Sequence, residues 1–359
     1  MRLWPRAWLR CGRVAAPPSE LIAEHLKRFP GFWHVVHEPE KLEWPPPRRF
    51  GAQSLEFALP EWSSQYGVLE LPHGSVYGVH GWVLSSNGSI LPELSWYGGP
   101  SERIVPSRPL PEPVRLKGTC LSLVSDWSCR NYSHFVLDGL GRLALFFDAG
   151  FSLEDVDHVY CPTPPSRAAA GLLDRLAIPP RKRLWAKPNQ LLFADTMLVP
   201  SLPATQLTYP HWLARFLKDA LVAKTVAPSN RRLYVSRNGY GRQAVREREV
   251  ENLLVEHGFE IYRASEHDDQ PRDFDRAAIV VGPHGAGLAN LAFCRPGTRV
   301  VEIVPSDNAY PFYYSLAVAA GLDYGYVVGR SVMKREPGAF GPSPYDYEID
   351  LDELRAALA

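Results

Sequence analysis

Residues 280–290 read VVGPHGAGLAN and combine an apolar strand, a glycine-rich turn and the start of a helix. Unpaired N–H groups and the positive end of the helix dipole make such a point a candidate anion site. Gly285 and Gly287 would let a phosphate approach the backbone closely, and His284 would add a donor. Alternatively, the glycines only tighten the turn and His284 is a core histidine, since the spacing matches neither the GxGxxG nor the Walker pattern.

Strand-like and helix-like segments alternate on both sides of this turn. Helices are predicted over residues 211–223, 247–257, 272–276, 288–293 and 311–321, and strands over 232–236, 259–262, 278–281 and 299–304. Because the run at 278–281 suits a strand buried on both faces, the alternation predicts a Rossmann-like parallel sheet.

Four segments are expected along the chain. They are an arm over residues 1–50, an α/β domain over 51–200, the Rossmann-like domain over 201–330, and a tail over 331–359 with an amphipathic helix at 347–359. Patterns typical of short apolar strands separated by turns dominate the sequence from residue 51 to 125. From there to residue 200, strand and helix patterns alternate. The predicted fold class is therefore α/β.

The composition excludes several classes of protein. Lys and Arg together number 39, as do Asp and Glu, so no overall positive charge favours nucleic acid as a partner. Five scattered cysteines without a CxxC pair indicate reduced thiols in a cytoplasmic protein. No apolar run has the length of a transmembrane helix. The basic, Trp-containing residues 1–13 are either a peripheral membrane anchor or a frayed terminus.

Arg237 follows the predicted strand 232–236 in a loop that contains Gly239 and Gly241. A guanidinium stays charged at any relevant pH and can bind two phosphate oxygens at once. Because this loop and the turn at 284–287 should leave the sheet at the same edge, Arg237 is a candidate diphosphate ligand. The alternative is a solvated loop arginine.

Residues 131–138, NYSHFVLD, place His134 and Asp138 four positions apart on one face of a helix predicted over 131–149. A carboxylate can orient an imidazole, or either group can take a proton from a hydroxyl. The alternative is an ordinary hydrogen bond between successive turns, with Asn131 as the N-cap.

A metal site is not predicted. Residues 266–269, EHDD, include metal-ligand types, but consecutive residues rarely converge on one ion, so the segment is expected to cap the following helix. No DxD-type cluster follows a strand to hold a divalent cation on a diphosphate.

The three motifs together resemble glycosyltransferase family 61, of the capsular polysaccharide type. The matching phrases are NYSHFVLDG at 131–139, YVSR at 234–237, GF at 258–259, VGPHGAGLAN at 281–290, PGT at 296–298, VE at 301–302 and the segment 313–321. They follow in the expected order, whereas the first 115 residues carry no recognised motif. Two departures are Arg246-Glu247, where members often have Asn-Glu, and Asp269-Gln270, where they often have Glu-Gln.

The resemblance implies a GT-B-like fold with two Rossmann-like domains facing a cleft, the nucleotide-sugar bound by residues 201–330 and the acceptor by 51–200. It also implies an inverting, metal-independent transfer without a cofactor, in which Arg237 grips the diphosphate and Asp138 or His134 is the base. The donor-binding residues it implies in the second half are His284, Gly285, Ala286, Gly287 and Asn290, with Glu302 as a ribose ligand.

The function expected from these features is transfer of a sugar from a nucleotide-diphosphate donor to a hydroxyl of a glycan or glycolipid, in bacterial surface polysaccharide assembly. The lack of a signal or anchor sequence favours a cytoplasmic enzyme, which the basic arm would bring to the inner face of the membrane. The alternatives are a nucleotide-sugar epimerase or hydrolase, and a non-catalytic nucleotide- or glycan-binding module.

Overall fold

The computed structural model describes residues 21–95, 110–223, 228–307, 309–333, 336 and 343–359. The basic residues 1–13, one interpretation of which is a membrane anchor, lie outside the described residues, whereas residues 21–50 of the expected arm form α1, β1 and β2 (Ile22–Leu26, Phe32–His37 and Arg48–Phe50). The chain divides into two compact units, Met1–Glu40 with Trp62–Gln206 and Lys41–Glu61 with Leu207–Ala359. We call them unit 1 and unit 2. The segment Lys41–Glu61, which the sequence analysis divided between the arm and the first domain, belongs to unit 2.

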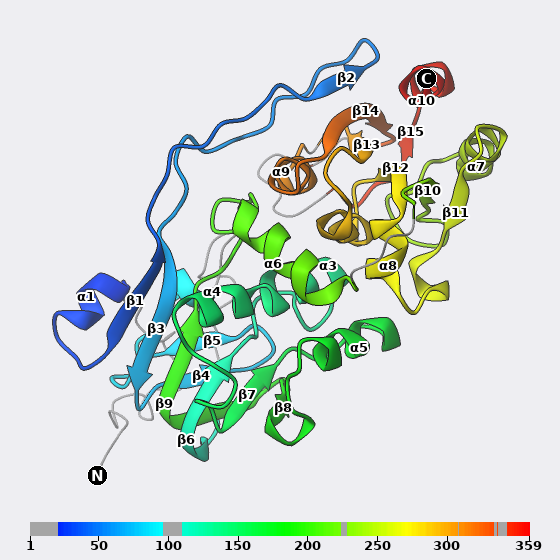
Figure 1. Ribbon diagram of the computed structural model, residues 1–359. Coiled ribbons are helices and arrows are strands. Elements are labelled where there is room, and N and C mark those ends of the chain that lie inside the picture. The colour runs from blue at the N-terminus through cyan, green and yellow to red at the C-terminus, as the bar shows by residue number, and fades with distance from the viewer. Residues whose placement is uncertain (1–20, 96–109, 224–227, 308, 334–335, 337–342) are drawn as a thin grey trace. The chain divides into compact units, whose positions relative to one another are not determined.

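Unit 2 is built on a seven-stranded sheet with the order β11-β10-β12-β13-β14-β15 and with β2 also paired to β14 (Figure 1). The strands are β11 (Glu260–Tyr262), β10 (Arg231–Val235), β12 (Ala277–Pro283), β13 (Arg299–Pro305), β14 (Asp323–Ser331), β15 (Tyr347–Glu348) and β2 (Arg48–Phe50). All neighbours are parallel except β14 and β15. The predicted parallel sheet is confirmed, and the strand β15 lies where the sequence predicted the start of a helix.

Helices cover the sheet of unit 2, and all except the short 3-10 helix at Ala264–Glu266 lie near their predicted places. They are α6 (His211–Leu221), α7 (Glu247–Glu256), the 3-10 helix η5 (Ala264–Glu266), α8 (Gln270–Asp275), the 3-10 helix η6 (Ala286–Phe293), α9 (Phe312–Ala319) and α10 (Leu351–Leu358). Helix α7 is terminated by His257 as the C-cap and by Gly258 after it, whose φ of +77° is the left-handed conformation that glycine adopts easily. Asp269 caps α8 by accepting the N–H of Arg272, which confirms the capping role predicted for the acidic segment.

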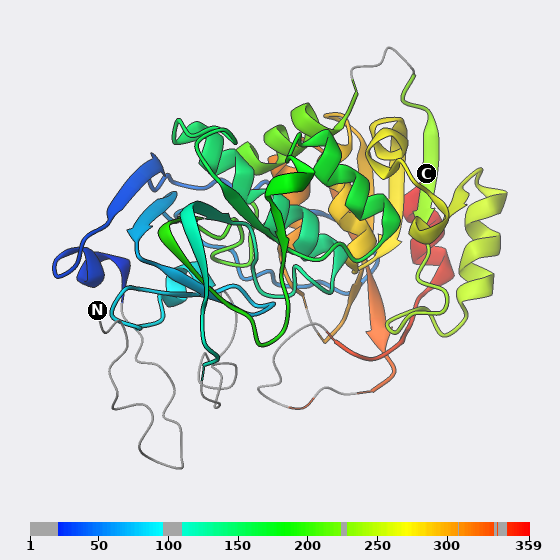
Figure 2. The ribbon, with the colours of Figure 1, turned by 90° about the horizontal axis from the view of Figure 1, so that it is seen from below.

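One face of this sheet forms a hydrophobic core of unit 2. Alternate strand residues such as Val281 and Val301 pack there with Leu254 of α7 and Leu354 of α10. Helices α7 and α10 lie side by side in both views (Figures 1 and 2). The C-terminal helix expected in a tail is therefore part of a folded core, and so is Phe50 of β2.

Unit 1 has a mixed eight-stranded sheet with the order β1-β3-β9-β6-β7-β8, and β4 joins β9 to β5. The strands are β1 (Phe32–His37), β3 (Tyr66–Pro72), β4 (Ser75–Tyr77), β5 (Trp82–Leu84), β6 (Val114–Ser122), β7 (His158–Cys161), β8 (Arg183–Trp185) and β9 (Leu191–Pro200). Strands β9, β6, β7 and β8 run parallel, whereas β1, β3, β4 and β5 pair antiparallel. The α/β fold class is thus confirmed.

The helices of unit 1 are short. They are α1 (Ile22–Leu26), α2 (Pro92–Ser95), α3 (Tyr132–His134), the π-helix η3 (Phe135–Leu140), α4 (Arg142–Asp148), α5 (Arg167–Arg175) and the 3-10 helix η4 (Pro180–Lys182). The helix predicted over 131–149 is therefore three segments, because the N–H of Gly141 bonds the carbonyl of Val136 five residues back, at 3.0 Å. π-Helical turns are rare and often mark functional sites.

The buried Arg142 holds three segments of unit 1 together. Its Nε donates to Pro200 O (2.9 Å), Nη1 to Val124 O (2.7 Å) and Nη2 to Leu94 O (3.1 Å). Burial lowers the pKa of this guanidinium to about 9, an effect that the charge of Asp138 opposes. Its cation therefore compensates for a buried carboxylate that lies one turn earlier in the helix.

No helix in the described part of the chain is long and apolar enough to span a bilayer. The described cysteines, Cys120, Cys129, Cys161 and Cys294, are free thiols.

Arg142→Met should lower the free energy of unfolding by about 3–5 kcal/mol, because it removes three buried hydrogen bonds to carbonyls and leaves Asp138 without its nearby cation. Urea denaturation followed by circular dichroism measures this. Arg181→Met, at an exposed position of η4, is the control and should change stability by less than about 0.5 kcal/mol. Equal midpoints for both variants would contradict the bridging role of Arg142.

Candidate functional site

The anion-site motifs of unit 2 flank the point where the strand order reverses. From β10 the chain passes through α7 to β11 on one side, and then through α8 to β12 on the other side of β10. Open α/β sheets bind ligands outside the carboxyl ends of the strands at such a switch point. Arg237 follows β10 there, and His284 follows β12.

The guanidinium of Arg237 lies directly on Gly285. A methyl group added to Gly285 would collide with Nη1 of Arg237 and lie 3.0 Å from its Cζ. The same guanidinium donates from Nε (3.1 Å) and Nη2 (2.7 Å) to the carbonyl of Gly241 in its own loop. The two loops that the sequence placed at one edge of the sheet therefore meet.

The turn itself is held against β10 by its second glycine. A Cβ on Gly287 would lie 2.6 Å from Cγ1 of Val235. The side chain of Asn290 is fully buried, and its Nδ2 donates to Gln270 Oε1 (2.8 Å) and to Gly287 O (3.1 Å). Asn290 thus fixes the shape of the turn. Because η6 begins at Ala286, the N–H groups of Ala286 and Gly287 have no acceptor within the helix.

A second guanidinium, that of Arg242, stands beside the first. Burial lowers the pKa of both arginines, and for Arg242 the charge of Arg237 lowers the pKa further. Neither forms an ion pair with a carboxylate among the residues that the structure describes. Arg242 also has a φ of +63°, a conformation that costs energy for a residue with a side chain. Two like charges that no carboxylate of the described residues neutralises suit a doubly charged anion.

Sequence reasoning missed Arg242 as a site residue. The sequence does show a second arginine directly after Gly239 and Gly241. Only its position next to Arg237 in the structure distinguishes it from a solvated surface arginine. Glu247 stabilises the loop that carries Arg237 and Arg242. Its carboxylate accepts hydrogen bonds from Tyr234 Oη (2.8 Å) and from the N–H of Ala244 (3.2 Å). Arg246, which departs from the family pattern, is exposed and pairs with Glu249 at 3.0 Å.

His284 is positioned by a buried carboxylate. Its Nδ1–H donates to Glu302 Oε1 at 2.6 Å, and Tyr324 Oη donates to the other oxygen at 2.7 Å. The side chain of His284 is 6% exposed and that of Glu302 is 0% exposed. Of the two, only His284 is accessible to a ligand. The ring of Tyr313 lies 4.9 Å from that of His284. In the structure Glu302 orients His284 for a contact through Nε2, and a ribose contact by Glu302 stays a prediction.

In unit 1, His134 and Asp138 form the pair that the sequence indicated. His134 Nδ1–H donates to Asp138 Oδ2 at 2.5 Å, and the two side chains are 19% and 0% exposed. Asn131 caps the helix by accepting the N–H of Ser133 at 2.9 Å, as the structural alternative required. Both interpretations are thus compatible with the contacts, but only His134 has access to solvent.

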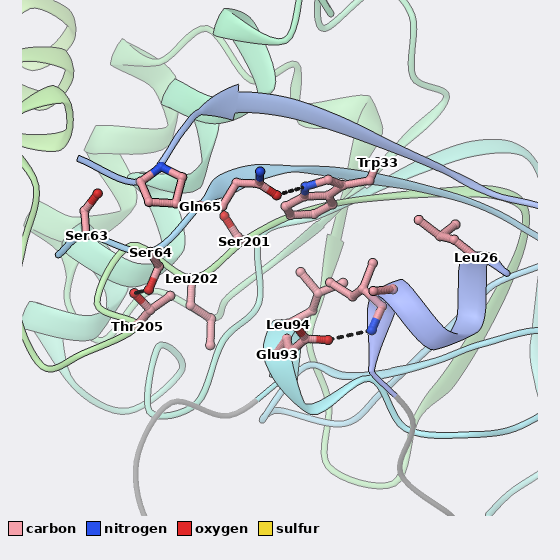
Figure 3. Close-up of a pocket in the computed structure, with 13 residues that line it drawn as sticks. Leu26, Trp33, Ser63, Ser64, Gln65, Glu93, Leu94, Ser201, Leu202 and Thr205 are labelled. Carbon is pink, nitrogen blue, oxygen red and sulfur yellow. Dashed lines mark hydrogen bonds between the residues drawn. The ribbon is translucent and has the colours of Figure 1, made fainter.

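A cavity of about 620 Å³ in unit 1 lies elsewhere (Figure 3). Its lining includes Trp33, whose Nε1 donates to Gln65 Oε1 at 2.9 Å, and Thr205, which donates to Ser64 Oγ at 2.8 Å. None of the site residues predicted from the sequence lines it. Because these polar groups already bond one another, the cavity offers a weaker case for a site than the switch point of unit 2.

Residues 132–301 match the model of the family Glycosyltransferase 61. The resemblance drawn from the motifs is therefore confirmed over this segment, which contains every predicted site residue except Glu302.

Two curated relatives are similar over shorter stretches. A protein O-linked-mannose beta-1,4-N-acetylglucosaminyltransferase 2 from Danio rerio is 32% identical over 91 residues, 23% of this chain and 16% of the relative. A beta-1,2-xylosyltransferase from Arabidopsis thaliana is 34% identical over 56 residues, 16% of this chain and 10% of the relative. The matches thus span only a small part of either relative's length, and both relatives are named as glycosyltransferases.

Gly285→Ala should weaken binding of inorganic pyrophosphate about tenfold or more, because the added methyl group displaces the Arg237 guanidinium. Calorimetric titration of the full chain measures it. Stability should change by less than about 1 kcal/mol, since the displaced atoms are the end of a flexible side chain. Gly241→Ala is the matched control, because its Cβ would have no neighbour closer than 3.9 Å. Equal affinity of both variants would show that the guanidinium does not bind the anion from this position.

Proposed function

We propose that the chain is a glycosyltransferase that moves a sugar from a nucleotide-diphosphate donor to a hydroxyl of a glycan or glycolipid acceptor. The observation that carries the proposal is the contact of Arg237 with Gly285 at the switch point of a parallel sheet. The match of residues 132–301 to glycosyltransferase family 61 supports the class of reaction. A GT-B-like architecture and an inverting outcome belong to the proposal as what the family resemblance implies.

In the proposed reaction an acceptor oxygen attacks C1 of the donor sugar on the face opposite the diphosphate. The new C1–O bond forms as the bond from C1 to the diphosphate oxygen breaks, and the acceptor proton passes to a base. The leaving diphosphate gains charge as it departs. Arg237, Arg242 and the N–H groups of Ala286 and Gly287 would neutralise this charge, and fixed donors of this kind lower the barrier without rearranging.

We assign the base to His134 and its orientation to Asp138. The buried carboxylate fixes the proton on Nδ1 of the imidazole, so Nε2 is the atom able to take a proton. Asp138 itself is fully buried and has no direct route to an acceptor.

The proposal includes two further points. The first is metal independence, supported by two guanidiniums that together can offset the double charge of a diphosphate. The second is the setting, bacterial surface polysaccharide assembly in the cytoplasm or at the inner face of the membrane, which rests on the sequence alone.

A panel of nucleoside diphosphates should raise the melting temperature of the full chain, with one base favoured and with no loss of the effect in EDTA. A ligand that binds only the folded state stabilises it by mass action. Differential scanning fluorimetry measures the shifts. A shift that disappears in EDTA would contradict metal independence, and no shift with any nucleotide would contradict the proposal.

Arg237→Ala should abolish the nucleotide-dependent shift and lower turnover about 10²–10³-fold, as expected for loss of one charged donor to the leaving group. Arg242→Ala should act in the same direction, whereas the exposed Arg246→Ala should have no effect. Turnover is followed as release of nucleoside diphosphate with and without a glycan panel. Donor consumption without acceptor would favour an epimerase or hydrolase, and nucleotide binding without consumption would favour a binding module.

His134→Ala and Asp138→Asn should lower turnover about 10²–10⁴-fold while leaving nucleotide binding unchanged, because they remove the base or its orientation in unit 1. The matched control is His158→Gln, at the first residue of β7 and therefore at the opposite end of the parallel strands. Full turnover of His134→Ala would assign the base to another residue.

A further inference from the structure

A second histidine–carboxylate pair in unit 1 is not used by the proposed reaction. His80 lies in the loop between β4 and β5, and its Nδ1–H donates to Asp126 Oδ1 at 2.5 Å. The side chain of Asp126 is 2% exposed, whereas that of His80 is 37% exposed. A buried carboxylate that holds an accessible imidazole leaves Nε2 of His80 for an external partner.

Both loops that carry this pair are rigidly built. A Cβ on Gly81 would collide with the carbonyl of Val124, so the β4–β5 loop sits directly on the segment that precedes Asp126. That segment forms a tight turn, in which Ser128 Oγ donates to Ser125 O (2.6 Å) and accepts the Ser125 N–H (3.0 Å). The position of His80 relative to Asp126 is therefore fixed before any ligand arrives.

Trp127 follows Asp126 in a strained and exposed position. Its φ is +62°, which costs about 1–3 kcal/mol for a residue with a bulky side chain. The side chain nevertheless gains little burial, since the residue is 49% exposed. Its carbonyl accepts the N–H groups of Arg130 (2.9 Å) and Asn131 (3.0 Å), and Asn131 caps the helix that carries His134. Burial of the indole therefore does not offset the cost of this backbone conformation.

We propose that Trp127, His80 and Asp126 form a saccharide-binding subsite that receives the acceptor. The flat face of the indole matches the C–H face of a pyranose ring, and Nε2 of His80 accepts a hydrogen bond from a ring hydroxyl. Asp126 is a positioning residue that fixes the tautomer of His80. The assignment of this saccharide as the acceptor rests on the proposed function, whereas binding of a saccharide does not.

The test uses the full chain labelled with 5-fluorotryptophan and observed by fluorine NMR. Trp127→Phe assigns the resonance of Trp127 among those of the ten tryptophans. The probes are the methyl glycosides of glucose, galactose, mannose, N-acetylglucosamine and xylose. At least one should shift the Trp127 resonance with saturation in the millimolar range, while the other tryptophan resonances serve as internal controls.

His80→Gln should weaken this binding about tenfold, and Asp126→Asn by a similar factor, because each removes or misorients one hydrogen bond to the sugar. His158→Gln, at the opposite end of the parallel strands, should leave it unchanged. His80→Gln lies at a partly exposed position and is expected to fold, so it decides the question if Asp126→Asn does not. Unchanged affinity in His80→Gln, or no movement of the Trp127 resonance with any of the five glycosides, overturns the subsite.

The outcome is separable from that of the proposed function. Nucleotide stabilisation tests the arginine loop of unit 2 and needs no saccharide, whereas the fluorine signal tests unit 1 and needs no nucleotide. Nucleotide stabilisation without glycoside binding overturns the subsite alone. Glycoside binding without nucleotide stabilisation overturns the proposed transfer and leaves a saccharide-binding unit.

Discussion

The contact between the Arg237 guanidinium and the bare Cα of Gly285 is the constraint on which the candidate donor site depends. A side chain at position 285 would occupy the space of the guanidinium. Without that contact, the arginine loop and the glycine turn would be two unrelated loops at one sheet edge. With it, two guanidiniums and the N–H groups of Ala286 and Gly287, which have no acceptor within η6, come together in one small region. This convergence makes the place suitable for a diphosphate, because no carboxylate among the described residues pairs with either arginine.

Among the described residues, three histidines are each held through Nδ1 by a buried carboxylate. Glu302 holds His284, Asp138 holds His134 and Asp126 holds His80, each through Nδ1. In all three pairs the carboxylate is buried and the imidazole is the more accessible partner. Since a carboxylate only accepts, each pair places the proton on Nδ1 and makes Nε2 the accepting nitrogen of the ring. The accessibility rises from His284 to His134 to His80, in keeping with a donor-turn contact, a base and a saccharide contact.

Residues that depart from the family pattern have structural explanations. Arg246 pairs with Glu249 on the surface of α7. The hydrogen bond from the N–H of Ala244 to Glu247, which supports the arginine loop, is therefore unaffected by the arginine at position 246. Asp269 caps α8, and the adjacent Gln270 bonds the buried Asn290 that shapes the glycine turn. Both departures therefore keep the contacts that fix the two loops of the site.

The sequence alone determined the parallel sheet of unit 2, because apolar periods, glycine stops and caps are local signals that survive without tertiary contacts. It also singled out His134, Asp138, Arg237 and the turn at 284–287 as candidates, since these stand at strand ends or share a helix face. Only the tertiary structure placed Arg242 beside Arg237 and paired His284 with Glu302 by a hydrogen bond. It also paired His80 with Asp126, 46 residues apart in the sequence. It also placed β2 and α10 in the core of unit 2. Such pairings depend on how distant segments pack, and no local spacing encodes which side chains will meet there.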